Sequence, residues 1–272
     1  MGDHDGDGGA STPEEAMGFS PIGNTTTNFT GTFDGQGHVI TGLTINRPAQ
    51  DFVGMFGYTS GTSNISNLGL EGGAVTGKGE VGGLAGYTDG SIASSYATGE
   101  VTGDDLVGGL VGYSDGGTIT SSYATGVVTG TTTVGGLVGA KDSGSITTSY
   151  ATGEVTGSSS VGGLVGYTGG SITTSYATGA VSGASRVGGL VGRNRGSITT
   201  SYATGTVTGT TEVGGLAGYN TGTITSSYWD TETSGQVNSA GGAPLSSAEM
   251  LLQASFTGFT FDASNWVIVD GL

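Results

Sequence analysis

The chain has 272 residues, of which 59 are glycine and only 10% are charged, well below the roughly 25% of an ordinary soluble domain. Its 22 acidic and 6 basic residues give a formal charge of −16, and this field disfavours nucleic acid and anionic membrane surfaces as partners. Cysteine is absent and only two histidines are present, which excludes disulfides and thiolate metal sites and leaves little material for histidine chemistry.

Residues 1–17 are predicted to be an acidic leader, and its composition is also consistent with disorder. Asp3, Asp5, Asp7 and Glu14 stand at the spacing of the carboxylate ligands in an EF-hand loop, so a Ca²⁺ site is one interpretation and an acidic linker is the other. The leader does not resemble a signal peptide, and no apolar run is long enough for a membrane helix. For an exported parent protein we therefore expect the signal upstream.

Residues 18–52 are predicted to lead into the repeats that follow. A glycine-rich turn around Asp34 and His38 is expected to be followed by strands that continue through Ile45. Asp34 near His38 could suggest acid–base chemistry. Stabilisation of the turn by these side chains is the structural alternative.

A Val-Gly-Gly-Leu sequence recurs in register through residues 53–228. Successive copies are 26 or 27 residues apart, and they begin at Val81, Val107, Val134, Val161, Val187 and Val213. A degenerate earlier copy begins at Val53. A fixed period of this length indicates a repeat architecture, and the extra residue of the longer copies falls in one turn before the Ser/Thr-Ile pair.

Residues within each copy alternate with a period of two, so that Ile146, Thr148 and Tyr150 are expected on one face and their neighbours on the other. The density of glycine argues against helix. Three short strands per copy, separated by glycine turns, predict one coil of a parallel β-helix. The fold class is therefore all-β: a single parallel β-helix of about seven coils, stacked about 4.8 Å apart, with a C-terminal cap.

Four columns of identical residues are predicted to form the core. Leucines begin at Leu84, isoleucines at Ile92, tyrosines at Tyr96 and valines at Val101, and each column continues through the later copies. One coil alone buries too little apolar surface, so stability is expected to come from contact between neighbouring coils.

A Ser/Thr-rich face is predicted opposite the Ile/Tyr face. The residues of this candidate binding surface are Thr120, Thr147, Thr173, Thr199, Thr225, Ser122, Ser149, Ser175, Ser201 and Ser227. A regular hydroxyl grid is similar to the faces of ice-binding solenoids, and it could equally bind a glycan or a protein sheet. The alternative is that Ser and Thr are simply common on exposed β surfaces.

Two charged features are expected on the outer surface. Asp89, Asp115 and Asp142 occupy the same turn in three consecutive coils, where a divalent cation would relieve their repulsion; solvated turn residues are the alternative. Arg186, Arg193 and Arg195 cluster in one coil. Arg186 is expected to pair with Glu212 of the next coil, and a polyanion site is the alternative interpretation of the cluster.

Residues 229–272 are predicted to cap the last coil, whose open strand edges would otherwise be exposed. A helix is expected over Ser246–Gln253, with Leu251 and Leu252 buried, followed by a final strand at 266–269.

The repeated Gly-Leu-Val/Ala-Gly segments, from Gly83 to Gly218, resemble the GLUG motif, and the flanks around Phe33–His38 and Tyr228–Gln236 are also similar to that family. The resemblance covers residues 18–272. Such repeats occur in bacterial surface and secreted proteins, including filamentous-haemagglutinin-like adhesins and some immunoglobulin A peptidases. The resemblance implies a right-handed β-helix located outside the cell or at its surface. The chain carries no peptidase motif such as His-Glu-x-x-His.

The sequence is thus predicted to be a structural and adhesive stalk module rather than an enzyme. Its expected partner is a host or environmental surface, glycan or protein, without nucleic acid or membrane insertion, and with self-association through the solenoid edges as a further expectation. Ca²⁺ is the one cofactor that the sequence suggests. The alternatives are an ice- or lattice-binding solenoid, a polysaccharide-acting enzyme and a fibre that assembles end to end.

Overall fold

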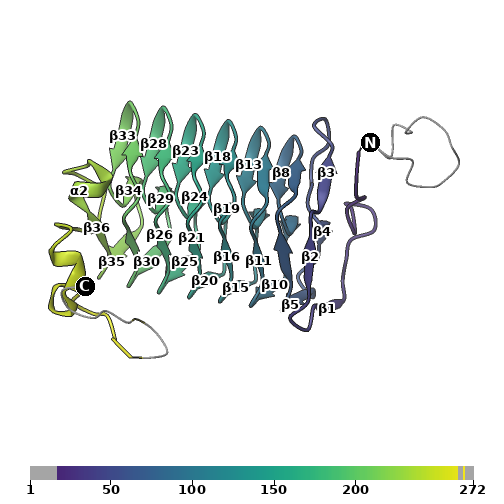
Figure 1. The fold of residues 1–272 in the computed structure, drawn as a ribbon, viewed down its shortest axis with the longest axis horizontal. Coiled ribbons are helices and arrows are strands. Elements are labelled where there is room, and N and C mark those ends of the chain that lie inside the picture. Colours follow the sequence, from purple (N-terminus) through teal and green to yellow (C-terminus); the bar gives the residue numbers. More distant parts are fainter. Residues whose placement is uncertain (1–16, 263–265, 267–272) are drawn as a thin grey trace, which may run out of the picture.

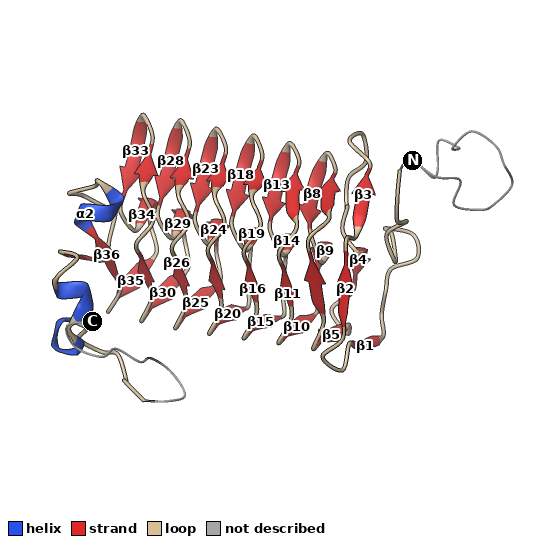
Figure 2. Ribbon diagram, in the orientation of Figure 1, coloured by secondary structure: helices blue, strands red, loops and turns tan. Residues whose placement is uncertain are grey.

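The structure is a computed structural model that describes residues 17–262 and 266. The chain winds into coils that stack along the long axis of the molecule, with the N-terminal and C-terminal segments at opposite ends (Figure 1). Nearly all regular structure is strand (Figure 2), and the named strands pair in parallel with the coil before and after. The prediction of an all-β parallel solenoid of about seven coils is therefore confirmed. In the part of the chain that the structure describes, no helix is long and apolar enough to cross a membrane.

Each regular coil contains five strands rather than the three predicted. The coil that begins at Ser91 runs through β10 (Ser91–Ala93), β11 (Tyr96–Ala97), β12 (Glu100–Thr102), β13 (Asp105–Gly108) and β14 (Val111–Ser114). Each of these strands belongs to a different sheet, and the sheets are numbered here from first to fifth in that order.

The sheets run the length of the solenoid. The other strands of the first sheet are β1 (Thr32–Asp34), β5 (Asn64–Ser66), β15 (Thr118–Thr120), β20 (Ser145–Thr147), β25 (Ser171–Thr173), β30 (Ser197–Thr199) and β35 (Thr223–Thr225). Those of the second sheet are β2 (Val39–Thr41), β6 (Gly69–Glu71), β16 (Tyr123–Ala124), β21 (Tyr150–Ala151), β26 (Tyr176–Ala177), β31 (Tyr202–Ala203), β36 (Tyr228–Asp230) and β37 (Ala243–Leu245). Those of the third are β3 (Thr44–Asn46), β7 (Ala74–Thr76), β17 (Val128–Thr129), β22 (Val155–Thr156), β27 (Val181–Ser182) and β32 (Val207–Thr208).

The remaining two sheets carry the Val-Gly-Gly-Leu segments. The other strands of the fourth sheet are β8 (Gly79–Gly82), β18 (Thr132–Gly135), β23 (Ser159–Gly162), β28 (Ser185–Gly188) and β33 (Thr211–Gly214). Those of the fifth are β4 (Phe56–Thr59), β9 (Ala85–Thr88), β19 (Val138–Lys141), β24 (Val165–Thr168), β29 (Val191–Asn194) and β34 (Ala217–Asn220).

The register between coils places identical residues above one another, as the repeat predicts. Ile119 pairs with Ile146 in the first sheet, and Val128 pairs with Val155 in the third. The isoleucine and leucine columns form one buried cluster with the valine column of Val138, and the valine columns of Val128 and Val134 form a second. Glycines allow the close approach of the coils, because a Cβ on Gly163 would overlap the carbonyl oxygen of Gly189 in the next coil.

The tyrosine column is superposed as predicted but does not lie in the core. Tyr123 pairs with Tyr150 in the second sheet, and both are partly exposed. The alanine that follows each tyrosine is buried instead, as at Ala124 and Ala151. Successive residues of a strand point to opposite faces, so the alanines fill the interior and the tyrosines lie outside.

The two ends are built from residues that do not repeat. At the N-terminal end, Ile22 and Phe29 bridge to β4 and partly cover its edge, and Phe29 and Phe33 pack on Phe56 with ring centroids 5.0 and 5.4 Å away. At the C-terminal end, β37 pairs with β36, and Ser239 Oγ accepts hydrogen bonds from two backbone N–H groups of the last coil.

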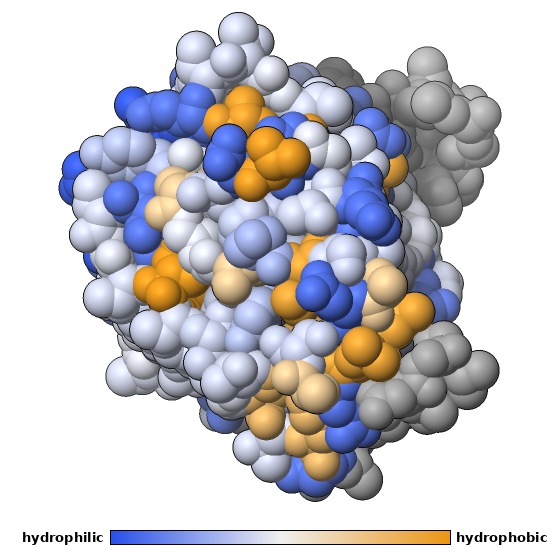
Figure 3. Space-filling view, turned by 90° about the vertical axis from the view of Figure 1, so that its left-hand side faces the viewer, coloured by the Kyte–Doolittle hydropathy of each residue, from blue (hydrophilic) through white to orange (hydrophobic). Residues whose placement is uncertain are grey.

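The helix predicted for Ser246–Gln253 is wrong. The segment forms two short 3₁₀ helices, η1 (Glu249–Leu251) and η2 (Gln253–Ser255), because the backbone becomes extended at Leu252. Leu251 and Leu252 are 43% and 41% exposed rather than buried. Figure 3 views this end of the solenoid, where hydrophobic side chains show as separate patches among polar ones.

Two further features complete the cap. A short helix that was not predicted, α2 (Thr231–Ser234), follows β36. Of the final strand predicted at 266–269, only Trp266 is described, and it bridges to Phe261; residues 267–269 lie outside the described residues.

Candidate functional site

The outer face of the first sheet carries two columns of hydroxyl side chains. The central isoleucine of each strand points inward, so its neighbours on both sides point outward. The predicted threonine column therefore lies on this face, at Thr120, Thr147, Thr173, Thr199 and Thr225. The second column consists of Ser91, Thr118, Ser145, Ser171, Ser197 and Thr223. Hydroxyls contact along the columns, as between Thr173 Oγ1 and Thr199 Oγ1, which are 3.2 Å apart.

The serine column predicted for the same face is wrong, because these side chains lie inside the solenoid. All five are buried: Ser122, Ser149, Ser175, Ser201 and Ser227. Ser149 Oγ donates to the Thr147 carbonyl oxygen at 2.9 Å and accepts from the Ser122 backbone N–H at 3.2 Å. The serines thus form an internal ladder that satisfies buried backbone groups from coil to coil.

The backbone conformation of one residue per coil explains why the serines lie inside the solenoid. Thr148, between β20 and β21, has a φ of 51°, and the equivalent residue is left-handed in each of the neighbouring coils. This corner breaks the alternation that was expected to continue from Ile146 to Tyr150. Ser149 therefore turns inward and Tyr150 outward.

The partly exposed tyrosines of the second sheet form a continuous stack. Rings from Tyr96 to Tyr202 lie 4.7 to 5.1 Å apart and within 6° of parallel. At one end, the hydrogen bond that the Tyr96 hydroxyl donates to Glu71 Oε1 is the main cause that raises the pKa of Tyr96 to about 12. At the other end, burial raises the pKa of Tyr202, and Trp266 packs against its ring at 5.4 Å.

The three aspartates of the predicted cation site, Asp89, Asp115 and Asp142, lie in successive turns after the fifth sheet, and two of their carboxylates have separate tyrosine partners. Asp115 accepts a hydrogen bond from the Tyr87 hydroxyl at 3.4 Å, and Asp142 accepts one from the Tyr113 hydroxyl at 2.7 Å. Burial is the largest cause that raises the pKa of Tyr113, followed by this hydrogen bond to Asp142. No three His, Asp or Glu side chains of residues 17–262 and 266 are grouped so that they could hold a metal ion.

A buried lysine lies beside these turns, and the sequence reasoning missed it. Lys141 is fully buried where the other coils place Thr or Ser or Asn, as at Ser114 and Thr168. Its Nζ donates to Ser114 Oγ at 2.9 Å and to the carbonyl oxygens of Gly116 and Gly117 in the one-residue-longer turn of the preceding coil. Burial lowers the pKa of Lys141 to about 8, and nearby aspartates oppose the shift. The Ala-Lys sequence at 140–141, in place of the Tyr-Thr or Tyr-Ser of other coils, was the available signal.

The other charged residues that the sequence singled out form ion pairs or hydrogen bonds with nearby residues. Arg186 Nε lies 3.0 Å from Glu212 Oε2, which confirms the predicted ion pair. Asp34 Oδ1 accepts hydrogen bonds from the Gln36 backbone and from Asn67 Nδ2, and the Asn67 bond is the main cause that lowers the pKa of Asp34. This contact stabilises a turn. Asp3, Asp5, Asp7 and Glu14 lie outside the described residues.

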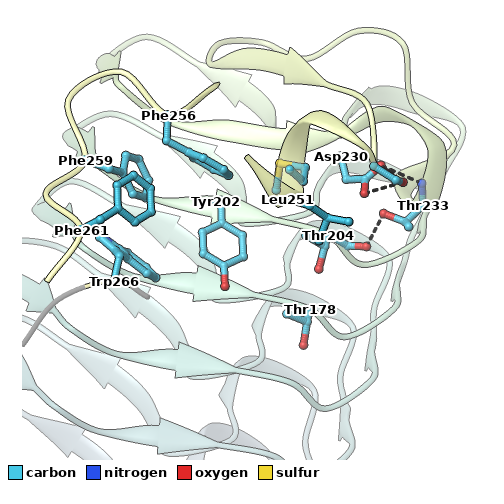
Figure 4. A pocket seen from close by; sticks show the side chains of 12 residues that line it. Thr178, Tyr202, Thr204, Asp230, Thr233, Leu251, Phe256, Phe259, Phe261 and Trp266 are labelled. Atoms are coloured by element: carbon cyan, nitrogen blue, oxygen red, sulfur yellow. Dashed lines mark hydrogen bonds between the residues drawn. The ribbon is translucent and has the colours of Figure 1, made fainter. Parts of the chain in front are cut away.

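A cavity of about 400 Å³ lies between the last coils and the cap (Figure 4). Phe256, Phe259 and Trp266 belong to its apolar wall. The carboxylate of Asp230 lines the opposite side, but it is already engaged, because it accepts from the backbone N–H groups of residues 232 and 233 and from the Ser247 hydroxyl at 2.8 Å. The cavity is thus an apolar hollow whose one carboxylate caps α2.

A second aromatic column lies on the outer face of the fifth sheet. Its members are Tyr58, Tyr87, Tyr113, Ala140, Tyr167, Arg193 and Tyr219. Tyr58 and Tyr87 stack with ring centroids 4.1 Å apart, and Arg193 lies over the rings of Tyr167 and Tyr219 at 5.6 and 5.9 Å. Sequence reasoning did not single out this column, although its tyrosines recur at the repeat spacing.

Comparisons with known proteins identify the repeats. The family described as "The GLUG motif" matches residues 77–102, 103–129, 157–182 and 183–208. Halomucin of Haloquadratum walsbyi is 39% identical over 88 residues, which are 31% of this chain and 1% of that protein. The chain therefore spans a very small part of this relative.

A solved structure shows the same fold. A chain from Bacteroides ovatus, described as a "putative immunoglobulin A1 protease", superposes with a TM-score of 0.58 at 23% identity, over 80% of this chain and 70% of that one. The chain therefore carries GLUG-motif repeats at residues 77–129 and 157–208, and these repeats are coils of a parallel β-solenoid.

Proposed function

We propose that this chain is a non-catalytic module of a secreted or cell-surface protein, in which a rigid solenoid presents the two hydroxyl columns of the first sheet to an external surface. The observation that carries the proposal is the regularity of that face. Identical pairings hold Thr147, Thr173 and Thr199 at a constant spacing of about one coil, roughly 4.8 Å. A repeated array suits a repetitive partner such as a polysaccharide or another sheet.

The chemistry of the coils supports a structural role. Their polar groups are largely used within the coils, as in the serine ladder around Ser149 and the hydrogen bonds of Lys141. The GLUG repeats and the similarity to halomucin support a surface-protein module. The likeness to the Bacteroides ovatus chain is at 23% identity and bears on the fold alone.

The test is binding of the purified chain to glycan arrays and to coated surfaces, with and without Ca²⁺. The variant replaces Thr147, Thr173 and Thr199 by valine, which keeps the side-chain shape and removes the hydroxyls. The control replaces Thr129, Thr156 and Thr208, which lie on the outer face of the third sheet, in the same way. We expect the first variant alone to lose attachment. Equal attachment by both variants, or no attachment by the unaltered chain to any surface, would contradict the proposal.

Ice or lattice binding is the second candidate, because the two outward columns alternate with buried isoleucine as Thr-x-Thr or Ser-x-Thr. Along a strand the columns lie about 6.6 Å apart, and between coils about 4.8 Å. Thermal hysteresis that the first valine variant abolishes would favour this function. Unchanged freezing behaviour at high concentration would remove it. Size-exclusion chromatography of the same samples would show whether the chain self-associates.

A further inference from the structure

One coil departs from the others in the aromatic column of the fifth sheet. Tyr113 and Tyr167 belong to the coils on either side, and Ala140 stands between them where a tyrosine ring would otherwise lie. The only other position from Tyr58 to Tyr219 without a tyrosine is Arg193, whose guanidinium fills its place by packing on both neighbouring rings. Ala140 has only a methyl group, which is buried at 2% exposure, so no ring stands at this position of the column.

The missing ring leaves a hollow of about 420 Å³ on the outer surface. Tyr113 and Tyr167 are among the residues that line it, with Ala140 between them. Arg193 covers the side of Tyr167 that belongs to the next coil, so the ring has a neighbour only on that side. The hollow is therefore bounded by two aromatic rings that no residue at position 140 separates.

The width of the hollow suits one six-membered ring. Two coil steps separate the backbones of Tyr113 and Tyr167 by about 9.6 Å, which leaves about 4.8 Å on each side for a ring between the two strands. The tyrosines of the second sheet stack at nearly this spacing, 4.7 to 5.1 Å. The negative faces of aromatic rings attract the weakly positive C–H groups of a saturated ring as well as the edge of an aromatic one.

The rims of the hollow favour a ring that carries hydroxyl groups. Thr133 and Ser160 line it from the fourth sheet, and Asp142 and Arg195 line it from the turns that follow the fifth sheet. Gly169, in the turn between those of Asp142 and Arg195, adds no side chain there. A phenyl ring would leave these polar groups without partners, whereas a sugar ring offers hydrogen-bonding groups at both edges.

The charges across the hollow are unequal. Asp142 accepts a hydrogen bond from the Tyr113 hydroxyl, so its carboxylate is engaged at the Tyr113 side. Arg195 has no salt bridge within residues 17–262 and 266, and Arg193 Nε is buried without a hydrogen-bond partner. Although the chain has a net charge of −16, the guanidinium groups of Arg193 and Arg195 make the hollow locally positive, which favours an anion there.

The floor of the hollow is held rigidly. Lys141, which follows Ala140, is buried and its ammonium group pins the turn of the preceding coil through Ser114 Oγ and two carbonyl oxygens. The segments that match the GLUG family also leave out 130–156, the stretch that contains both residues. The departure from the repeat is therefore local, and it coincides with the hollow.

We propose that this hollow binds one pyranose ring of an acidic polysaccharide, stacked between Tyr113 and Tyr167 with its carboxylate toward Arg195 and its hydroxyls toward Asp142. The proposal deepens the adhesive role given above by naming an anionic glycan as the partner and one coil as its site.

The experiment is isothermal titration calorimetry of the full chain with oligogalacturonate, with a neutral galactan oligosaccharide, and with N-acetyltyrosinamide as an aromatic probe. The decisive variant is Ala140→Tyr, which restores the repeat and fills the hollow. We expect it to weaken oligogalacturonate binding at least tenfold while the melting temperature stays equal or rises. Arg195→Gln is expected to weaken oligogalacturonate binding and to leave galactan binding unchanged. Arg186→Gln, which alters an arginine paired elsewhere, is the matched control and should change neither.

Three results would overturn the proposal: no binding of oligogalacturonate by the unaltered chain, binding that survives Ala140→Tyr, or saturation by N-acetyltyrosinamide alone, which would make an aromatic side chain the occupant. The outcome is separable from that of the proposed function. Attachment to surfaces that Ala140→Tyr leaves intact would remove the sugar site and keep the adhesive module. Oligogalacturonate binding without surface attachment would keep the sugar site and remove the adhesive module.

Discussion

The repeated coils and the C-terminal cap solve the same problem, the burial of apolar side chains, in different ways. In the coils each buried residue packs on its own copies, as Leu164 does between Leu137 and Leu190. In the cap each contact is made once, as where Phe256 packs on Tyr228 with ring centroids 5.2 Å apart. A repeated contact is stabilised by every neighbouring coil, whereas a single contact depends on the local chain alone.

This difference has a consequence for prediction and for stability. A column that is correctly predicted to be buried in one coil is buried in the other coils as well. The interior is therefore made of residues that recur with the repeat. The cap has no copies, and its leucines proved exposed. We expect the coils to unfold cooperatively and the cap to open locally at lower free energy.

The same substitution in the two regions gives the largest expected contrast. Leu164→Ala removes a fully buried side chain and should lower the free energy of unfolding by about 3–4 kcal/mol through lost burial and a cavity. Leu252→Ala, in the cap at 41% exposure, should change it by less than about 0.5 kcal/mol. Urea denaturation followed by circular dichroism measures both. Equal effects would mean that the cap and the coils do not differ in packing.

The buried lysine of the coil that departs from the repeat should make stability depend on pH. The pKa of Lys141 falls from its ordinary value of 10.5 to about 8, so between these values the unfolded chain binds more protons than the folded one. The free energy of unfolding should therefore rise with pH over this window, by about 2–3 kcal/mol relative to Lys141→Met. Chemical denaturation at pH 8, 9 and 10 tests this. If the difference in free energy of unfolding between the unaltered chain and Lys141→Met did not change with pH, burial would not lower the pKa of Lys141.

The serine ladder predicts a smaller loss within the coils. Ser175→Ala removes a buried hydroxyl that accepts from the Ser149 backbone N–H and donates to the Thr173 carbonyl oxygen, and should cost about 1–2 kcal/mol. Ser171→Ala, which alters a hydroxyl of the outer face, is the matched control and should change stability little. If the control cost as much as Ser175→Ala, the ladder would not be a stabilising element.

The smallest effect is expected for the ion pair on the outside of the coils. Arg186 and Glu212 are each about 40% exposed, and exposed pairs contribute little because water and salt screen them. A double-mutant cycle with Arg186→Gln and Glu212→Gln should give a coupling of less than about 1 kcal/mol, and less still in 0.5 M salt. A large coupling that salt does not alter would show that the pair is desolvated.

The candidate sites were predictable only in part. The threonine column was placed correctly on the outer face, because Thr147 follows an inward isoleucine within one strand. The serine column failed because Thr148 adopts a left-handed conformation that non-glycine residues rarely take, and nothing in the alternation signals it. The hollow at Ala140 could not be predicted from the sequence pattern alone. The register of three successive coils shows that Ala140 stands where its neighbours have tyrosine rings.

The sequence by itself determined the coil length, the parallel stacking and the isoleucine, leucine and valine columns of the interior, since identical side chains at a constant spacing bury apolar surface best when they are superposed. Only the tertiary structure decided which polar and aromatic columns face water. The left-handed residue between the first and second sheets of each coil, as at Thr148, turns the serine that follows it inward and the next tyrosine outward. The form of the cap was also decided by the tertiary structure. Its contacts occur only once, so they leave no periodic pattern in the sequence.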